Sequence, residues 1–379
     1  MAGQSFSSRV QGFWQRVTEG LELSELWSQF RADAQSSYRL YSRDVNSSQV
    51  SGYRGLRRFF RLVGQFFWAV LEKLTPARRV LLLLALAMLL LPVATWTQGG
   101  GRGEETVSSP DFHFMGGALM FALLIMEVGD RVVMKRDLQI AKEIQGWLLP
   151  AAPPAISGLE IAFATRPANT VAGDYYDVFA RTGSSAAGET FLIAIADVAG
   201  KSVPAALLMA SFQASLKTLS AMPGSLTELA ARLNGYAATN SQNGRRFTTA
   251  VIAEYDPPSR RLEYVNAGHN SPILLRKSGQ LDRLQTGGVP FGILAGASYQ
   301  SAQLILEPGD WLAFFTDGVP EAENLAQQQY SEERLVTMLR WGAAMPASML
   351  LGEILADIDR FVQKAPQHDD ITCMLLRVV

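Results

Sequence analysis

Hydrophobic positions are concentrated in two uninterrupted runs in the first third of the chain. VLLLLALAMLLLPVATW covers residues 80–96, FHFMGGALMFALLIMEV covers residues 112–128, and Glu127 is the only Asp, Glu, Lys or Arg in either run. Each run is near the lower limit of roughly 17 residues that a helix needs to cross a bilayer. We therefore predict a transmembrane helical hairpin within residues 79–129, with a pair of buried helices in a soluble domain as the alternative.

Basic residues flank this hairpin on both sides. Arg78 and Arg79 precede the first run, and Arg131 follows the second together with Lys135 and Arg136. The loop at residues 97–111 contains a single Arg. Because positively charged flanks stay on the cytoplasmic side, we expect both ends of the chain in the cytoplasm and only this loop outside.

The segments on either side of the hairpin have amphipathic patterns that each allow two interpretations. Residues 1–78 form an N-terminal region in which residues 53–74 mix Arg and Lys with Phe and Trp. This mixture suits either a helix in the membrane interface or a soluble amphipathic helix. Residues 130–158 begin with a predicted amphipathic helix that ends at Pro150 and has Leu138, Ala141 and Leu148 on one face. We expect this helix either to pair with its copy in a homodimer or to pack on its own domain.

Residues 159–379 combine short strand patterns with helical ones. The strands outnumber the helices and follow one another through turns such as DPPSR and RKSGQ, which favours antiparallel sheets covered by helices over a parallel sheet. We therefore predict an α+β domain. The strand patterns are LEIAFATR, TFLIAIAD, RFTTAVIAEYD, RLEYVNAG, PILLR, WLAFFTD and ITCMLLRVV, and the helical ones are VPAALLMASFQASLKTLS, SLTELAARLNGYAA, SEERLVTMLRWG and PASMLLGEILADIDRFVQ.

Composition and charge narrow the classes of function. The chain has 34 Lys and Arg against 35 Asp and Glu, a formal net charge of −1, which gives no whole-chain reason to expect a nucleic acid as partner. Cys373 is the single cysteine, so an intramolecular disulfide and a cysteine-rich zinc site are both excluded. Its position in the apolar run ITCMLLRVV predicts a thiol buried in the core.

Several apolar strand patterns carry an aspartate within them or at one end. A single such aspartate usually forms a turn or caps a helix. Carboxylates gathered at one sheet edge would raise one another's pKa unless a cation held them ionised, and hard oxygen ligands select Mg²⁺ or Mn²⁺ over zinc. Two such ions can activate a water for attack on a phosphoryl group, so the pattern indicates metal-dependent phosphoester hydrolysis. These aspartates are Asp174, Asp177, Asp197, Asp317, Asp369 and Asp370.

Six motifs together resemble a known family. They are, in order along residues 138–379, IQGWLLP, AGDYYDVF, IADVAGKSVPAALLMA, YVNAGHNSPILL, FFTDGVPEA and HDDITCMLL. In content, order and spacing this set resembles the SpoIIE/RsbU-like branch of the PPM-type metal-dependent serine/threonine phosphatases. The resemblance implies an α-β-β-α sandwich with a centre of two Mn²⁺ or Mg²⁺ ions, or three, at one edge of the sheets. It also implies a phosphoserine or phosphothreonine protein as substrate, often a small anti-anti-sigma factor with a STAS domain.

The resemblance assigns metal ligands motif by motif. It implies that Asp174 and Asp197 are the core ligands, with the Val198 carbonyl helping in the same turn. Asp317 and Asp369 would complete the set on the other side, and these four aspartates would form the catalytic centre. Asp370 would be an outer-sphere ligand or a structural cap.

Other positions in the motifs receive weaker assignments. Asp177 lies three steps along the strand from Asp174 and is expected on the opposite face. The family usually has Gly where Ala172 and Ser202 stand, but both replacements are small and remove no carboxylate, so we expect activity to survive. His269 in NAGHN is expected to hold its loop near the site rather than to act as a catalytic acid.

The sequence therefore predicts a protein serine/threonine phosphatase anchored in the bacterial cytoplasmic membrane by two spans, with its catalytic domain in the cytoplasm. The main alternative is a pseudophosphatase, a silent scaffold that binds a phosphoprotein, although no metal ligand is missing. A nucleotide cyclase is a weaker alternative. AGDYY only superficially resembles the GGDEF loop, because the second acid that the loop requires directly after the first is absent.

Overall fold

The computed structural model describes residues 64–65, 67–68, 71–91, 96–97, 106–107, 112–181, 189–241 and 244–379. The chain divides into two units, Met1–Arg131 and Val132–Val379. Two predicted segments lie mainly outside the described residues, namely the amphipathic helix at 53–74 and the external loop at 97–111.

The two apolar runs fall on two helices of unequal length. α4 (Pro76–Leu90) has 15 residues, whereas α5 (Phe112–Leu148) has 37 and continues into the second unit. Among the described residues, α5 alone is long and apolar enough to cross a membrane, judged by length and composition. The predicted pair of spans is therefore not confirmed. α4 ends early because Leu91, which precedes Pro92, is extended with φ −66° and ψ 132°.

Within the first unit, α4 packs against the beginning of α5 as an antiparallel pair. A Cβ atom on Gly116 of α5 would lie 2.9 Å from the carbonyl oxygen of Ala85, so this glycine permits the close approach of the helices. Arg78, near the start of α4, donates a hydrogen bond of 2.6 Å to Asp130 of α5. Between the helices, the short strands β1 (Trp96–Thr97) and β2 (Thr106–Val107) pair with each other.

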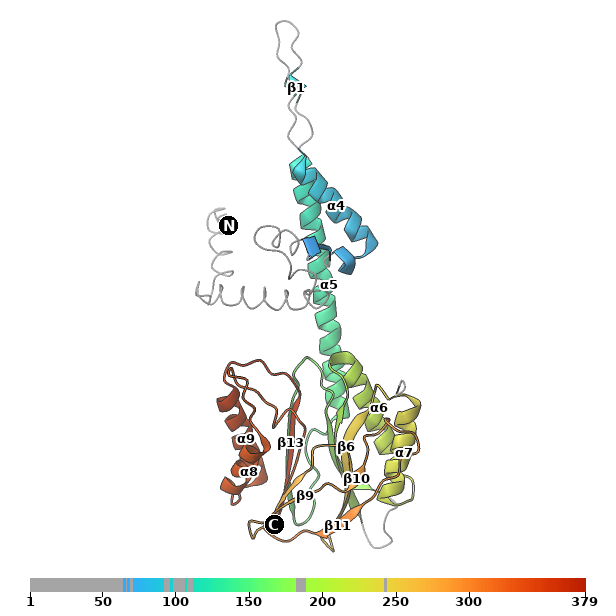
Figure 1. Cartoon of the computed structure of the whole chain (residues 1–379), viewed down its shortest axis with the longest axis vertical. Helices are drawn as coiled ribbons and strands as arrows, with labels where there is room; N and C mark the ends of the chain where they lie inside the picture. The colour runs from blue at the N-terminus through green and yellow to red at the C-terminus, as the bar shows by residue number, and fades with distance from the viewer. Residues whose placement is uncertain are drawn as a thin grey trace, which may run out of the picture. The chain divides into compact units, whose positions relative to one another are not determined.

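The second unit contains two sheets between two pairs of helices (Figure 1). In its described residues, the first sheet has the strand order β10-β7-β6-β5-β4, and β11 also pairs with β7. All of these pairs are antiparallel except β10 with β7. The strands are β4 (Tyr175–Arg181), β5 (Thr190–Val198), β6 (Thr248–Asp256), β7 (Arg261–Ala267), β10 (Gly287–Gly288) and β11 (Ala302–Ile305).

The second sheet has the strand order β3-β13-β12-β8-β9, and each neighbouring pair is antiparallel. β13 pairs with the edge strand β3 on one side and with the central strand β12 on the other, so it is an interior strand of the sheet. The strands are β3 (Leu159–Arg166), β8 (Ile273–Leu275), β9 (Leu281–Arg283), β12 (Trp311–Phe315) and β13 (Ile371–Val378).

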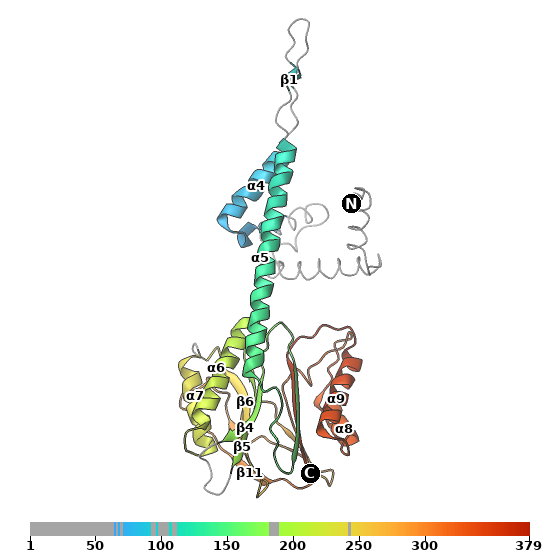
Figure 2. The same ribbon diagram turned by 180° about the vertical axis from the view of Figure 1, so that it is seen from behind.

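Helices cover the outer face of each sheet, as both views of the ribbon show (Figures 1 and 2). One hydrophobic cluster, which includes Ile193 and Met374, fills the space between the sheets. A second lies between the first sheet and α6 and α7, and a third, which includes the buried thiol of Cys373, lies beneath α8 and α9. This arrangement is the predicted α-β-β-α sandwich. The helices are α6 (Ser202–Ser220), α7 (Leu226–Thr239), α8 (Glu332–Trp341) and α9 (Ala347–Val362).

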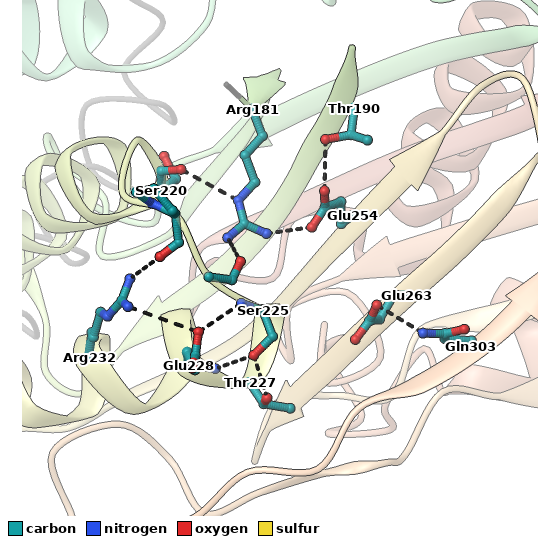
Figure 3. A network of polar contacts seen from close by, with 12 residues as sticks. Arg181, Thr190, Ser220, Ser225, Thr227, Glu228, Arg232, Glu254, Glu263 and Gln303 are labelled. Atoms are coloured by element: carbon teal, nitrogen blue, oxygen red, sulfur yellow. Dashed lines mark hydrogen bonds and ion pairs between the residues drawn. The ribbon is translucent and has the colours of Figure 1, made fainter. Parts of the chain in front are cut away.

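A buried ion pair fixes the α6–α7 layer to the first sheet (Figure 3). Arg181, the last residue of β4, pairs with Glu254 of β6, and Thr190 donates to the same carboxylate at 2.7 Å. Arg181 also donates to the carbonyl oxygen of Gly224, in the turn between the two helices, at 2.8 Å. Because both charges are paired and hydrogen-bonded, this buried network is compatible with a stable core. It lies at the far end of β4 from Asp174.

Candidate functional site

The two sheets bring their aspartate-bearing strand ends to one edge. In the β4–β5 hairpin Tyr175 pairs with Ala196, so Asp174 and Asp197 stand opposite each other. Across the sandwich, Thr316 follows β12 and its hydroxyl donates to Asp174 at 2.8 Å. That hydrogen bond ties the end of the second sheet to the end of the first.

Asp174 is the most deeply buried carboxyl of the set, with 2% of its surface exposed. Burial raises its pKa well above the usual range, and the negative charge of Asp197 raises it further. The Thr316 hydroxyl and a hydrogen bond from Thr372 oppose this rise. A carboxylate in this position therefore needs either a proton or a cation.

Burial and neighbouring negative charges also raise the pKa of two other aspartates in this set. Burial raises the pKa of Asp197 to about 7, helped by the charges of Asp317, Asp369 and Asp370. Burial also raises the pKa of Asp317, with Asp369 as the next cause. The structure thus brings the predicted ligands close enough to repel one another.

The Val198 carbonyl faces the same space as the Asp197 carboxylate. A Cβ atom built on Gly173 would lie 3.3 Å from the Val198 carbonyl oxygen and 3.9 Å from Asp197 Oδ1. Glycine therefore leaves open a small space between these two oxygens that a side chain would fill.

Asp369 and Asp370 are adjacent in sequence but have different surroundings. Asp370 is buried and accepts hydrogen bonds of 2.6 Å from the backbone N–H groups of Ala168 and Gly173, one on each oxygen. Asp369 is partly exposed and pairs with the Lys201 ammonium at 2.9 Å. The geometry favours the structural-cap assignment for Asp370, whereas Asp369 keeps its carboxylate accessible.

Gly318 explains why the turn after β12 has the sequence Asp-Gly. A Cβ atom at this position would lie 2.0 Å from the Asp370 carbonyl oxygen. Only glycine lets the Asp317 turn and the Asp369–Asp370 segment meet backbone to backbone, and this contact brings the two acidic segments together.

The donor set has the chemistry of a divalent-cation site. Carboxylates and a main-chain carbonyl are the ligands that Mg²⁺ and Mn²⁺ prefer. Within the part of the chain that the structure describes, no group of three or more His, Cys, Asp or Glu side chains is already arranged to hold an ion. The mutually raised pKa values nevertheless indicate an excess of negative charge that a cation would neutralise. The residues present therefore fit the implied metals.

His269 lies behind this edge and is buried, with 7% of its surface exposed. Its Nδ1 atom lies 2.9 Å from the Thr249 hydroxyl, which donates in turn to the Asp197 carbonyl oxygen at 3.3 Å. Burial lowers the pKa of His269 to about 4, so the ring is neutral near pH 7. These contacts fit the expected structural role and give the imidazole no exposed proton to donate.

Residues that support the acids were not identified from the sequence. Thr316 and Thr372 hold Asp174, Lys201 holds Asp369, and Gln145 of α5 hydrogen-bonds the backbone of Ala172. All four lie within or beside the six motifs, and this position was the sequence feature that could have identified them. Their roles depend on contacts between segments far apart in the chain.

Asp177 lies away from the site, as expected. It accepts a hydrogen bond of 2.9 Å from the Tyr175 hydroxyl and pairs with Lys217 of α6 at 2.7 Å. It therefore attaches the α6 layer to β4 and is not available as a ligand.

Comparison with known proteins identifies the family. The family model described as Stage II sporulation protein E (SpoIIE) matches residues 187–379, about half of the chain. The chain belongs to the SpoIIE family. Among curated relatives of this SpoIIE-family chain, IcfG from Synechocystis is 28% identical over 305 residues, which are 73% of this chain and 46% of IcfG. The chain thus spans about half the length of that relative.

Two further matches each cover about two thirds of this chain. The phosphoserine phosphatase RsbU of Bacillus subtilis is 28% identical over 247 residues, covering 64% of this SpoIIE-family chain and 70% of RsbU. The solved SiaA-PP2C domain of Pseudomonas aeruginosa aligns with a TM-score of 0.56 at 22% identity, covering 65% of this chain and 98% of that domain. The predicted PP2C-like α+β fold is confirmed.

Proposed function

We propose that this SpoIIE-family chain is a membrane-anchored, metal-dependent phosphatase that hydrolyses phosphoserine or phosphothreonine in a protein. The observation that carries the proposal is the convergence of four aspartates, Asp174, Asp197, Asp317 and Asp369, at one edge of the sandwich. Burial and mutual repulsion raise the pKa of the first three. The relationship to RsbU, which is named a phosphoserine phosphatase, supports the same reaction.

In this proposal Asp174 and Asp197 are the core ligands of two Mn²⁺ or Mg²⁺ ions, together with the Val198 carbonyl. Asp317 and Asp369 complete the set. When bound, such ions lower the pKa of a water molecule and stabilise charge on a phosphoryl group. The protein's own contribution is to fix the ligands.

A cleft beside Asp369 offers a place for the phosphorylated segment of the substrate. Its volume is about 420 Å³, and Gly318, Arg166 and Lys201 are among its lining residues. Lys201 lies 2.9 Å from Asp369, so its ammonium can turn toward a phosphate without leaving the site. We propose a phosphorylated STAS-domain anti-anti-sigma factor as the partner, on the strength of the family resemblance.

The two alternatives receive less support. A pseudophosphatase would be expected to lack a ligand, and each assigned carboxylate is present at the same edge. The geometry does not support a nucleotide cyclase, because that function would leave the convergence of Asp317 and Asp369 with Asp174 unexplained.

For the membrane, we propose that α4 and α5 form the anchor in the bacterial cytoplasmic membrane, with the catalytic unit in the cytoplasm. The antiparallel contact at Gly116 and the ion pair of Arg78 with Asp130 support a hairpin whose two ends lie on the same side. A test is maleimide labelling of intact cells, with single cysteines at Ser108 or Ser278. Labelling of Ser108→Cys alone is expected, and labelling of Ser278→Cys alone would reverse the topology.

We also propose a homodimer formed through the part of α5 in the second unit. Leu138, Ala141 and Leu148, the predicted face, are half-buried within their own unit, which supports the alternative of packing within one chain. Ile140, Ile144 and Trp147 are exposed at 45%, 47% and 80% and recur at helical spacing on another face. This exposed stripe is the surface that a second copy would cover.

The activity is tested with the full chain in detergent or nanodiscs. We expect release of phosphate from p-nitrophenyl phosphate and from a phosphoserine peptide that requires Mn²⁺ or Mg²⁺ and stops with EDTA. Binding of the phosphopeptide without turnover, at any metal concentration, would favour the pseudophosphatase. Turnover of a nucleoside triphosphate to a cyclic product would favour the cyclase.

A further inference from the structure

A second cavity lies at the opposite end of the second sheet from the aspartates. Its volume is about 680 Å³. β13 connects the two places, because Asp370 immediately precedes it and Arg377 near its other end lines the cavity. At about 3.3 Å per residue, the strand separates them by roughly 25 Å. The cavity is therefore distinct from the proposed catalytic edge.

The lining of this cavity is cationic on an apolar floor. It contains no Asp or Glu side chain. Val379 also lines the cavity, and a free carboxylate there would offset only one of the positive charges. The apolar floor includes Trp311 and Ala343, and the cationic side chains are Arg276, Lys277, Arg340 and Arg377.

Two of these cations already have partners, and two do not. Arg276 pairs with the buried Asp310 at 2.8 Å, and Arg377 lies 3.5 Å from a carboxylate oxygen of Glu160. Among the described residues, Lys277 and Arg340 form no ion pair with an acid. Uncompensated positive charge therefore faces the cavity from two separate segments.

One donor in the cavity wall has no acceptor. The Nε atom of Arg377 is buried without a hydrogen-bond partner. Its guanidinium lies 5.7 Å from the Trp311 ring, whose own N–H donates to the Ala343 carbonyl oxygen at 3.1 Å. The Arg377 guanidinium is thus held by the Trp311 ring and Glu160, so it forms part of the cavity wall and leaves Lys277 and Arg340 as the cations open to an anion.

We propose that this cavity binds a small organic anion with a flat apolar part. The anionic group would lie between Lys277 and Arg340, and the apolar part would rest on Ala343, Ala344 and the Trp311 side of the floor. A volume of about 680 Å³ is within the range of small-molecule sites, roughly 300–1,000 Å³, which are mostly apolar with a few polar groups for orientation. The binding does not depend on phosphatase activity.

The probe for this site is 8-anilinonaphthalene-1-sulfonate, a fluorescent aromatic anion. The isolated unit Val132–Val379 is suitable because it contains both sheets and all three hydrophobic clusters, and because the SiaA-PP2C domain, which has the same fold over 65% of this chain, was solved as a domain by itself. We expect saturable binding of one probe per chain with a Kd in the micromolar range. The uncharged analogue N-phenyl-1-naphthylamine should bind at least tenfold more weakly.

Two independent variants locate the probe. Lys277→Gln with Arg340→Gln removes the charges, and Ala344→Trp fills the cavity at an exposed loop position, so each should weaken binding at least tenfold. Arg245→Gln, at an exposed position outside the cavity lining, is the matched control and should leave Kd unchanged. Thermal melting confirms folding of each variant. Absence of saturable binding, equal binding of the uncharged analogue, or binding retained by both cavity variants would overturn the proposal.

Discussion

Gln145 holds Ala172 with both ends of its side-chain amide. Its Nε2 atom donates to the Ala172 carbonyl oxygen at 2.7 Å, and its Oε1 atom accepts from the Ala172 N–H at 2.9 Å. Ala172 lies two residues before Asp174, so the last turns of α5 are attached directly to the segment that carries the first proposed ligand. The position of this helix and the position of the ligand are therefore linked.

We predict that Gln145→Leu lowers kcat about tenfold or more while the unit stays folded. The change leaves two buried backbone groups of Ala172 without partners and lets the Asp174 segment shift, and small displacements of catalytic groups are costly. Metal-saturated phosphatase assays and circular dichroism measure the two effects. Gln139→Leu, on an exposed position of the same helix, is the control and should retain full activity. Equal activity of both variants would mean that the contact serves only packing.

Asp317→Asn is predicted to reduce turnover by about a hundredfold or more with little change in fold. It removes one proposed anionic ligand without changing the shape of the side chain, and in the proposed mechanism the two ions would supply most of the activation of the nucleophile. Calorimetric titration with Mn²⁺ should show weaker binding in parallel. Asp256→Asn, at the last residue of β6, is the matched control. Full Mn²⁺-dependent activity in a folded Asp317→Asn variant would contradict the assignment of the metal site.

In the metal-free protein, stability should fall as pH rises from about 4 to about 7. Asp197 has its pKa raised to about 7 in the folded state, whereas an unfolded Asp titrates near 3.9. Between these values the folded state holds a proton that the unfolded state has released, so this contribution is complete below about pH 4 and is lost toward pH 7.

Thermal melting with EDTA across this pH range measures the effect. Asp197→Asn should flatten the dependence, because an amide does not titrate. Saturating Mn²⁺ should raise the melting temperature most at the high end of the range, where the carboxylates are ionised. A metal-free melting temperature that rises over the same interval would refute the proposed electrostatics.

The stripe of Ile140, Ile144 and Trp147 predicts which changes separate the subunits. Ile144→Glu places a charge in the proposed dimer contact and should give a folded monomer of reduced activity. Leu138→Glu, on the half-buried face, should instead lower the melting temperature without a dependence on protein concentration. Sedimentation velocity distinguishes these results, with the exposed Lys142→Glu as control. A wild-type unit that is monomeric and fully active at tens of micromolar would exclude a regulatory dimer.

Pattern alone predicted most of the strands and helices of the second unit because each long element has its own hydrophobic signature, whereas the α-β-β-α sandwich was implied by the family resemblance. LEIAFATR became β3 and ITCMLLRVV became β13 with shifts of no more than one residue. The short strands β9, β10 and β11 were missed, since two to four residues contain too little periodicity to recognise. The first apolar run extends to residue 96, whereas α4 ends at Leu90, because Pro92 lies inside the run and a helix does not continue into the residue before a proline.

The candidate site was predictable only in part. An aspartate at the end of an apolar strand is visible in the sequence, and the order of the motifs pointed to the same acids. The hydrogen bond from Thr316 to Asp174 joins positions 142 residues apart, and that between Gln145 and Ala172 spans 27. No local pattern encodes such pairings, because they arise from how the two sheets stack.

The pairing of β3 with β13 has a consequence for biosynthesis. The two strands are matched along their whole length, and the hydroxyls of Thr165 and Thr372 lie 2.8 Å apart although 207 positions separate them. At roughly 5–20 residues per second, β3 leaves the ribosome about 10–40 s before its partner exists. Asp369 and Asp370 are made at the same late point, immediately before β13. A nascent chain therefore has no complete acidic edge until these residues have been translated, and its unpaired β3 edge is exposed to chaperones and to neighbouring nascent chains throughout that interval.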